Sequence, residues 1–200
     1  MITYETIILL SWATFLAVWA VLAFNVKRDI RGGYGDLWQR LWLLRIGAAA
    51  LIIFLVTRIT TGTAHYANNP ASFFSRGIFP QSPVLGWIAA ALSVLGVGFA
   101  IWARVHLGRN WSPQPAVKVG HELVTSGPYA FVRHPIYTGI ILMAFGTALT
   151  GTIFGIGVFL IASIVFILRI RKEEKIMLGL FPNEYREYEK RTKRLVPFVW

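Results

Sequence analysis

The fold is decided by the long stretch from Pro135 to Leu168, which reads PIYTGIILMAFGTALTGTIFGIGVFLIASIVFIL and contains no charged residue. A single helix of this length would extend about 50 Å at about 1.5 Å per residue, well beyond the roughly 30 Å hydrocarbon core of a bilayer. The small polar triplet Thr150-Gly151-Thr152 lies at its middle. The stretch therefore predicts a helical hairpin with membrane spans at 135–149 and 153–168.

Three further apolar runs precede this hairpin, at residues 6–26, 41–61 and 83–103. Each is close to the length of about 20 residues that crosses a bilayer, and the second carries arginines only near its ends. The whole chain is 56% hydrophobic and 14% charged, a composition typical of membrane proteins. We therefore expect one all-α integral membrane domain over residues 1–200, with five transmembrane helices.

Small residues within these runs indicate where helices pack closely. Gly86, Gly96 and Gly98 lie in the third span, and Gly151 and Gly155 have a small-xxx-small spacing in the hairpin. Small residues allow helix backbones to approach one another in a membrane. We interpret these glycines as packing residues and not as a dinucleotide-binding motif, because no strand precedes them.

The net charge of +11 has a distribution that argues against nucleic-acid binding. Most lysines and arginines follow the first, third and fifth spans, and five alternating crossings put all these segments on one side of the membrane. Basic loops mark the cytoplasmic side, so we expect the N-terminus outside and a multi-pass topology. The absence of cysteine, with no metal-ligand spacing among the histidines, predicts no metal site.

Two polar segments at the expected cytoplasmic face, 114–137 and 169–200, are candidates for a functional site. Arg169 and Glu173 are spaced i, i+4 and therefore share one helical face. Two interpretations stay open on spacing alone. The two residues are either a surface ion pair, or an arginine for a substrate carboxylate beside a carboxylate for a cofactor's ammonium group. The polar and aromatic residues of 114–137 are also typical of an interfacial belt.

The strings HELVTSGPY at 121–129 and RHPIYTG at 133–139 resemble the signature of the isoprenylcysteine carboxyl methyltransferase family. The tail, with EE at 173–174 and FPNEY at 181–185, resembles the ending of the same family, although its proline stands where glycine is usual. The resemblance covers roughly residues 114–197. It implies a prokaryotic-type integral membrane methyltransferase that uses S-adenosylmethionine and releases S-adenosylhomocysteine.

Carried over residue by residue, the resemblance also implies the site. Arg169 is expected to position the carboxylate of a lipophilic, prenylcysteine-like substrate that enters from the bilayer. This carboxylate is ionised at neutral pH, so its methylation needs no general base. The cytoplasmic loop and tail are expected to bind the cofactor through Gln114, His121, Glu122, Leu123, Val124, Tyr129, His134, Pro135, Ile136, Tyr137 and Glu173.

Three other functions remain open at this point. A phospholipid amine N-methyltransferase would need a base to remove a proton from an ammonium group and would not need Arg169. A relative of the sterol reductases would bind NADPH. A scaffold or transporter would bind no cofactor at all.

Overall fold

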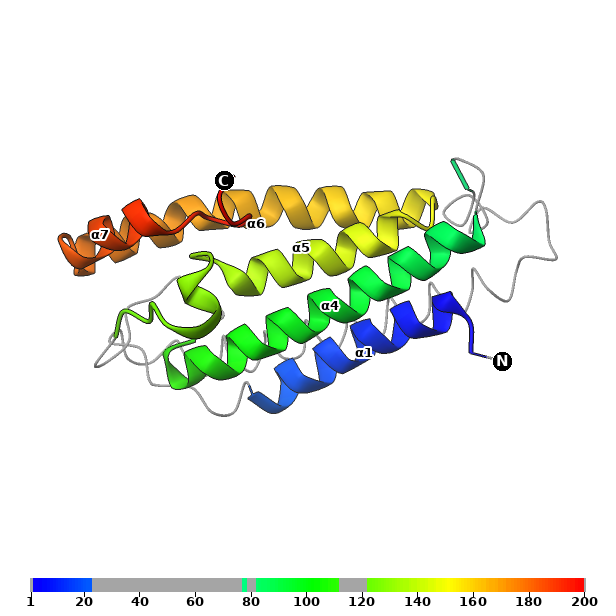
Figure 1. Cartoon of the computed structure of the whole chain (residues 1–200), viewed down its shortest axis with the longest axis horizontal. Coiled ribbons are helices and arrows are strands. Elements are labelled where there is room, and N and C mark those ends of the chain that lie inside the picture. The colour runs from blue at the N-terminus through cyan, green and yellow to red at the C-terminus, as the bar shows by residue number, and fades with distance from the viewer. Residues whose placement is uncertain (1, 23–76, 79–81, 112–121, 200) are drawn as a thin grey trace, which may run out of the picture.

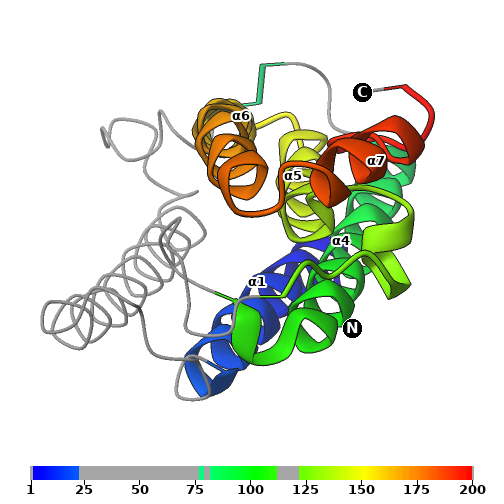
Figure 2. The ribbon, with the colours of Figure 1, turned by 90° about the vertical axis from the view of Figure 1, so that its left-hand side faces the viewer.

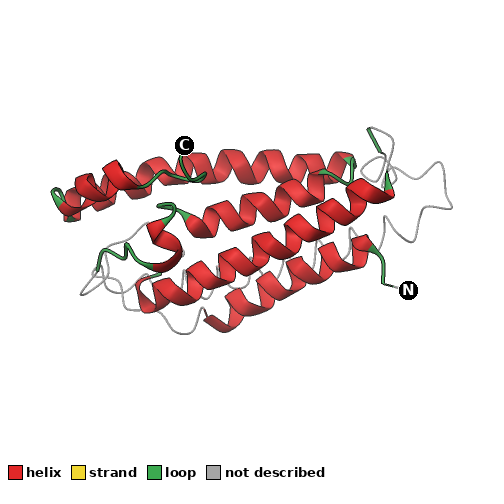
Figure 3. Cartoon of the chain, viewed as in Figure 1, coloured by secondary structure: helices red, strands yellow, loops and turns green. Residues whose placement is uncertain are grey.

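The computed structural model of the chain describes residues 2–22, 77–78, 82–111 and 122–199. Within these ranges there is no strand beyond two isolated bridges, so the all-α prediction is confirmed for the part that is described. Figure 3 shows the helical content. The elements are α1 (Tyr4–Leu22), α4 (Pro83–Leu107), the 3-10 turns η1 (Gly108–Asn110) and η2 (Gly127–Ala130), α5 (Pro135–Ala148), α6 (Ile153–Leu180) and α7 (Glu184–Arg191).

The four long helices lie side by side in the order α1, α4, α5, α6 (Figures 1 and 2). Three segments are long and apolar enough to cross a membrane, namely α1, α4 with η1, and α6, whereas α5 is apolar but has only 14 residues. Large apolar side chains are exposed along α6, a surface that soluble monomers rarely carry. These side chains are Leu160, Ile161, Ile164, Val165 and Leu168. The chain is thus a multi-pass integral membrane protein.

The expected second span, 41–61, lies outside the described residues, so the count of five spans stays a prediction. Helices are present at the other four expected spans and begin at Tyr4, Pro83, Pro135 and Ile153. The last of them continues to Leu180, beyond the expected end at 168, and residues 23–26 of the first expected span lie outside the described residues. The proline at the start of α4 and of α5 suits a first helical turn, where a missing N–H breaks no internal hydrogen bond.

Glycines hold α4 and α5 in close contact. A Cβ atom added at Gly96 would lie 2.6 Å from the carbonyl oxygen of Gly139, and one added at Gly139 would lie 2.6 Å from that of Gly96. Gly86 packs in the same way against the ring of Tyr4 in α1. For Gly98 the described residues show no such packing, because none of their atoms lies within 4 Å of its added Cβ. Two residues along a helix point about 200° apart, so Gly96 and Gly98 cannot both face α5.

The chain reverses between α5 and α6 through a hydrogen-bonded turn. The N–H of Gly151 donates to the carbonyl of Ala148 at 2.9 Å, and Gly151 has a φ of 74°, which favours glycine. The hydroxyl of Thr152 then accepts the N–H of Gly155 at 3.0 Å and caps the start of α6. These contacts let two helices follow each other with few residues between them.

One continuous α6 carries the chain from the apolar bundle to its polar end. About 12 residues follow Leu168 within the helix, a length of about 18 Å at about 1.5 Å per residue. After α6, the chain folds back through α7, and the N–H of His134 donates to the carbonyl of Arg194 at 3.0 Å. The start of α5, the end of α6 and the C-terminal tail therefore meet at one end of the molecule (Figure 1).

Candidate active site

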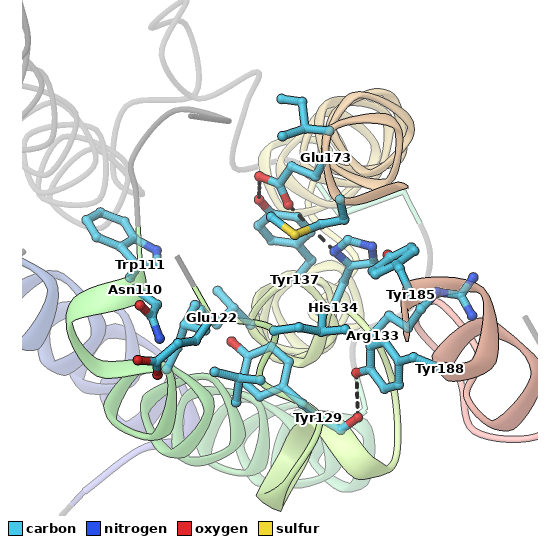
Figure 4. A pocket seen from close by; sticks show the side chains of 16 residues that line it. Asn110, Trp111, Glu122, Tyr129, Arg133, His134, Tyr137, Glu173, Tyr185 and Tyr188 are labelled. Atoms are coloured by element: carbon cyan, nitrogen blue, oxygen red, sulfur yellow. Dashed lines mark hydrogen bonds and ion pairs between the residues drawn. The ribbon is translucent and has the colours of Figure 1, made fainter. Parts of the chain in front are cut away.

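A pocket of about 870 Å³, including its open mouth, lies at this polar end. Figure 4 shows that its lining comes from the end of α4, the loop before η2, the start of α5, and α6 with α7. The lining includes eight residues that the sequence predicted, namely Glu122, Leu123, Val124, Tyr129, His134, Ile136, Tyr137 and Glu173.

The remaining predicted residues lie elsewhere. Gln114 and His121 fall outside the described residues. Pro135 is buried as the first residue of α5 and does not line the pocket. Arg169 does not line it either, but its side chain contacts two residues that do.

Arg169, Tyr137 and Glu173 form a hydrogen-bonded cluster at the edge of the pocket. The Tyr137 hydroxyl donates to Oε1 of Glu173 at 2.6 Å. Nε of Arg169 donates to the Tyr137 oxygen at 2.7 Å and to Oε1 of Glu173 at 2.9 Å. Both bonds use Nε, so the two terminal nitrogens of the guanidinium have no hydrogen-bond partner among the described residues. These two bonds therefore leave the planar fork that binds carboxylates unused.

His134 joins this cluster to a second carboxylate. Its ring stacks on Tyr137 with centroids 5.6 Å apart and planes 2° from parallel. Nδ1 lies 3.6 Å from Oε2 of Glu173, and Nε2 lies 3.5 Å from Oε1 of Glu174. Burial lowers the pKa of His134, but the two carboxylates outweigh it and raise this pKa above its ordinary value. At 3.5 Å the Nε2 contact is an ion-pair approach, and Nε2 makes no hydrogen bond with suitable geometry.

Glu174 connects the site to the C-terminal tail. Its Oε1 accepts from Nε of Arg133 at 2.9 Å, and its Oε2 accepts from Nε of Arg194 at 2.9 Å. The guanidinium of Arg133 also donates to the carbonyls of Glu189 and Thr192. The side chains of Glu174 and Arg133 are almost fully buried, at 6% and 8% exposed. This network fixes α7 and the tail over the pocket.

The aromatic residues of α7 form part of the wall. Tyr185 and Tyr188 line the pocket, and the Tyr188 hydroxyl donates to the carbonyl of Tyr129 at 2.5 Å. On the opposite side Trp111 lies with its ring 4.3 Å from the guanidinium of Arg104. Arg104 is 1% exposed. It also donates to the carbonyls of Gly108 and Leu22, and so ties the end of α1 to the end of α4.

Sequence reasoning missed Arg133, Glu174, Trp111, Tyr185 and Tyr188 as site residues. The i, i+4 rule finds the partner of Glu173, but the partners of Glu174 lie 41 and 20 positions away along the chain. A signal was available for three of them, because Arg133, Glu174 and Tyr185 lie within the strings that resemble the family.

The pocket suits a cation that also carries a flat ring. Glu122 and Glu173 supply carboxylates to its lining, and four aromatic side chains supply faces that attract positive charge. These side chains are Trp111, Tyr129, Tyr185 and Tyr188. His134 adds a buried Nε2 that faces Glu174 at 3.5 Å and makes no hydrogen bond with suitable geometry among the described residues. S-adenosylmethionine carries a sulfonium, an ammonium group and an adenine ring, and therefore fits this donor set.

Comparison with known proteins agrees with this chemistry. Residues 89–179 match the sequence profile described as the isoprenylcysteine carboxyl methyltransferase family. The chain is 29% identical to "Protein-S-isoprenylcysteine O-methyltransferase" of Schizosaccharomyces pombe, over 92% of this chain and 81% of that protein. It is 38% identical to the protein of the same name from Mus musculus, over 73% of this chain. It spans only 54% of the mouse protein.

A solved structure described as a eukaryotic intramembrane Ras methyltransferase, an isoprenylcysteine carboxyl methyltransferase, is also similar. The TM-score is 0.48 with 21% sequence identity, over 94% of this chain and 75% of that chain. A likeness at this level supports no argument about the site.

Proposed function

We propose that the chain belongs to the isoprenylcysteine carboxyl methyltransferase family, whose profile its residues 89–179 match. We propose further that it transfers a methyl group from S-adenosylmethionine to the carboxylate of a lipophilic, prenylcysteine-like substrate. The observation that carries this proposal is the cluster of Arg169, Tyr137 and Glu173. Glu173 lines the pocket, and Arg169 contacts it through Nε. The cluster thus brings a carboxylate that suits a cation beside a guanidinium that suits an anion.

The pocket side of the cluster would bind the cofactor. Glu173 and Glu122 would attract its positive groups, and the aromatic lining would contact its ring. When bound, S-adenosylmethionine supplies a methyl group on a positively charged sulfur. Tyr137 holds Glu173 in place through a 2.6 Å hydrogen bond, so this carboxylate is oriented before any ligand arrives.

Arg169 would bind the acceptor. The terminal nitrogens of Arg169 would orient the substrate carboxylate, and one carboxylate oxygen would attack the methyl carbon as the carbon–sulfur bond breaks. The bonding electrons stay on sulfur, and no proton moves. The packed rings of His134, Tyr137 and Phe166 limit the access of water to this point.

Methylation of an amine is a poorer fit to these residues. It would require a neutral base near the acceptor to remove a proton from an ammonium group. His134 is the histidine of this cluster, and it lies between the carboxylates of Glu173 and Glu174, which favour its protonated form. A protonated imidazole cannot act as that base.

The arrangement of charges also supports an orientation. The basic tail and the site lie at the same end of the bundle, and basic segments favour the cytoplasmic side. We infer that the site faces the cytoplasm, that the N-terminus lies outside, and that the lipid part of the substrate enters from the bilayer.

Arg169 gives the test of this function. Methyl transfer from labelled S-adenosylmethionine to a prenylcysteine acid should fall by about a hundredfold or more in Arg169→Ala, and Arg169→Lys should rescue it poorly because lysine lacks the fork. Arg171→Ala is the matched control, since Arg171 is exposed on the same helix. Unchanged ester formation by Arg169→Ala, or transfer to phosphatidylethanolamine at the wild-type rate, would refute the carboxylate assignment.

A further inference from the structure

The C-terminal tail returns to the start of α5 and ends beside its first turn. The N–H of His134 donates to the carbonyl of Arg194 at 3.0 Å, and the hydroxyl of Thr138 donates to the carbonyl of Leu195 at 2.7 Å. Leu195 is buried at this contact. The tail is therefore fixed in register along α5 up to Leu195.

This turn of α5 lies at the level where the apolar part of α6 ends. Tyr137 accepts a hydrogen bond from Arg169, the first charged residue after the long apolar stretch. Trp102 and Phe131 expose their rings nearby, with centroids 6.4 Å apart. Exposed aromatic rings gather at the boundary between membrane and water. The tail thus reaches the membrane boundary at Leu195.

Beyond Leu195 the apolar side chains point away from the protein. Val196, Phe198 and Val199 are 49%, 95% and 75% exposed. The N–H of Val199 donates to the carbonyl of Val196 at 3.2 Å, which closes a turn with Pro197 and Phe198 at its centre. Phe198 has a φ of 67°, a value that a type II turn requires at this position and that glycine normally supplies. A phenylalanine there is unfavourable for the backbone and holds a large apolar ring outward.

Basic residues directly precede this apolar tip. Arg191 and Lys193 are exposed; Arg191 is the last residue of α7, and Lys193 lies between α7 and the turn. Lysine and arginine next to a membrane surface are attracted by anionic lipid headgroups. An apolar tip beside a basic segment is the usual composition of an interfacial anchor.

We propose that residues 191–199 form a membrane anchor, with Phe198 and Val199 inserted at the lipid boundary and Arg191 and Lys193 on anionic headgroups. The anchor continues from α7, whose Tyr185 and Tyr188 line the pocket. The bilayer therefore holds this wall of the pocket in place. The partner is an anionic lipid surface, and the proposal does not depend on the reaction at the site.

Site-directed spin labelling tests the depth of the tip. The sequence contains no cysteine, so Phe198→Cys and Arg186→Cys each provide a single labelling site. Arg186 is exposed on α7 and serves as the control. In nanodiscs of phosphatidylcholine and phosphatidylglycerol, the label at 198 should collide more with oxygen than with a water-soluble nickel chelate, and the label at 186 should show the reverse. Equal preference for nickel at both positions would overturn the proposal.

Phe198→Gly tests whether the anchor holds α7 and the tail in place beside the pocket. Glycine accepts the positive φ, so the turn is kept while the apolar ring is lost. Amide exchange of His134, whose N–H is bonded to the tail, should be about threefold or more faster than in the wild type in the same nanodiscs. Arg191→Gln with Lys193→Gln should accelerate it in discs containing phosphatidylglycerol and leave it unchanged in phosphatidylcholine alone. Wild-type exchange in all of these variants would contradict the proposed anchor.

Discussion

The interface between α4 and α5 and the polar cluster at the end of α6 hold the molecule together by different means. Between α4 and α5 the contacts are made by Gly96, Gly139 and Gly146, each of which brings a backbone against the neighbouring helix. At the end of α6, Glu174 is almost fully buried and is bonded to two arginines. The first region depends on shape and the second on paired charge.

The difference follows from the surroundings of each region. Lipid offers apolar contact as readily as a protein does, so helices within a bilayer associate through close packing at small residues. At the membrane boundary, buried charges are stable only when they are paired, and losing one partner leaves the other uncompensated. In the polar cluster, Glu174 of α6 joins Arg133, just before α5, to Arg194 of the C-terminal tail. The cluster is therefore the region that organises the site.

The largest effect is expected from disturbing the shape of the α4–α5 interface. In Gly139→Val the Cβ would lie 2.6 Å from the carbonyl oxygen of Gly96 and 2.7 Å from the backbone nitrogen of Ala100. Backbone cannot move aside as a flexible side chain does, so the helices must separate. We expect a loss of about 3 kcal/mol or more in the free energy of unfolding, measured by denaturation in detergent.

Gly98→Val is the matched control for this substitution. It places the same side chain in α4, but the added Cβ meets no atom of residues 2–22, 77–78, 82–111 or 122–199 within 4 Å. We expect a change in the free energy of unfolding of less than about 0.5 kcal/mol. Equal destabilisation by both substitutions would show that helix propensity, and not close packing, explains the loss.

A smaller loss is expected from removing charge at Glu174. Glu174→Gln keeps the shape but leaves buried Arg133 without its carboxylate. Because Arg194 is partly exposed and can be solvated, we expect a loss of about 2–3 kcal/mol in the free energy of unfolding. Glu187→Gln, at a fully exposed carboxylate on α7, should leave the melting temperature unchanged. A wild-type melting temperature for Glu174→Gln would contradict the organising role of this cluster.

The smallest effect concerns the protonation of His134. Its pKa is raised in the folded state, so folding favours the protonated imidazole between Glu173 and Glu174. The contribution of this protonation to the free energy of unfolding is complete below the unfolded pKa of about 6.5. It is lost as the pH rises through the folded pKa. The melting temperature should therefore decline across that window. His134→Gln should flatten this decline, and an identical profile in both proteins would contradict the paired state of His134.

The sequence predicted the helices of the described part well, because uncharged apolar runs of membrane length have few alternatives. The hairpin sequence around Thr150 to Thr152 folds as a turn and a helix cap through contacts between near neighbours. Gly98 shows the limit of this reasoning. Composition identifies a glycine as a packing residue, but only the direction in which it faces decides whether another helix is there.

The site was predictable to the extent that its contacts are local or its residues match the family. The Arg169–Glu173 pair follows from helical spacing, and it is present at 2.9 Å. The bond from Tyr137 to Glu173 joins two helices, and spacing within one helix could not predict it. The same holds for Trp111, whose position depends on its contact with Arg104 and on a fold that brings α1 and α4 together.

The central claim is that the pocket binds the methyl donor through Glu173, and calorimetric titration of the purified protein with S-adenosylhomocysteine tests it most directly. We predict that Glu173→Gln weakens binding at least about tenfold, or about 1.4 kcal/mol. Glu187→Gln should bind like the wild type. An unchanged affinity in a folded Glu173→Gln protein would contradict this role, and Glu173 would then serve only as a structural partner of Arg169, Tyr137 and His134.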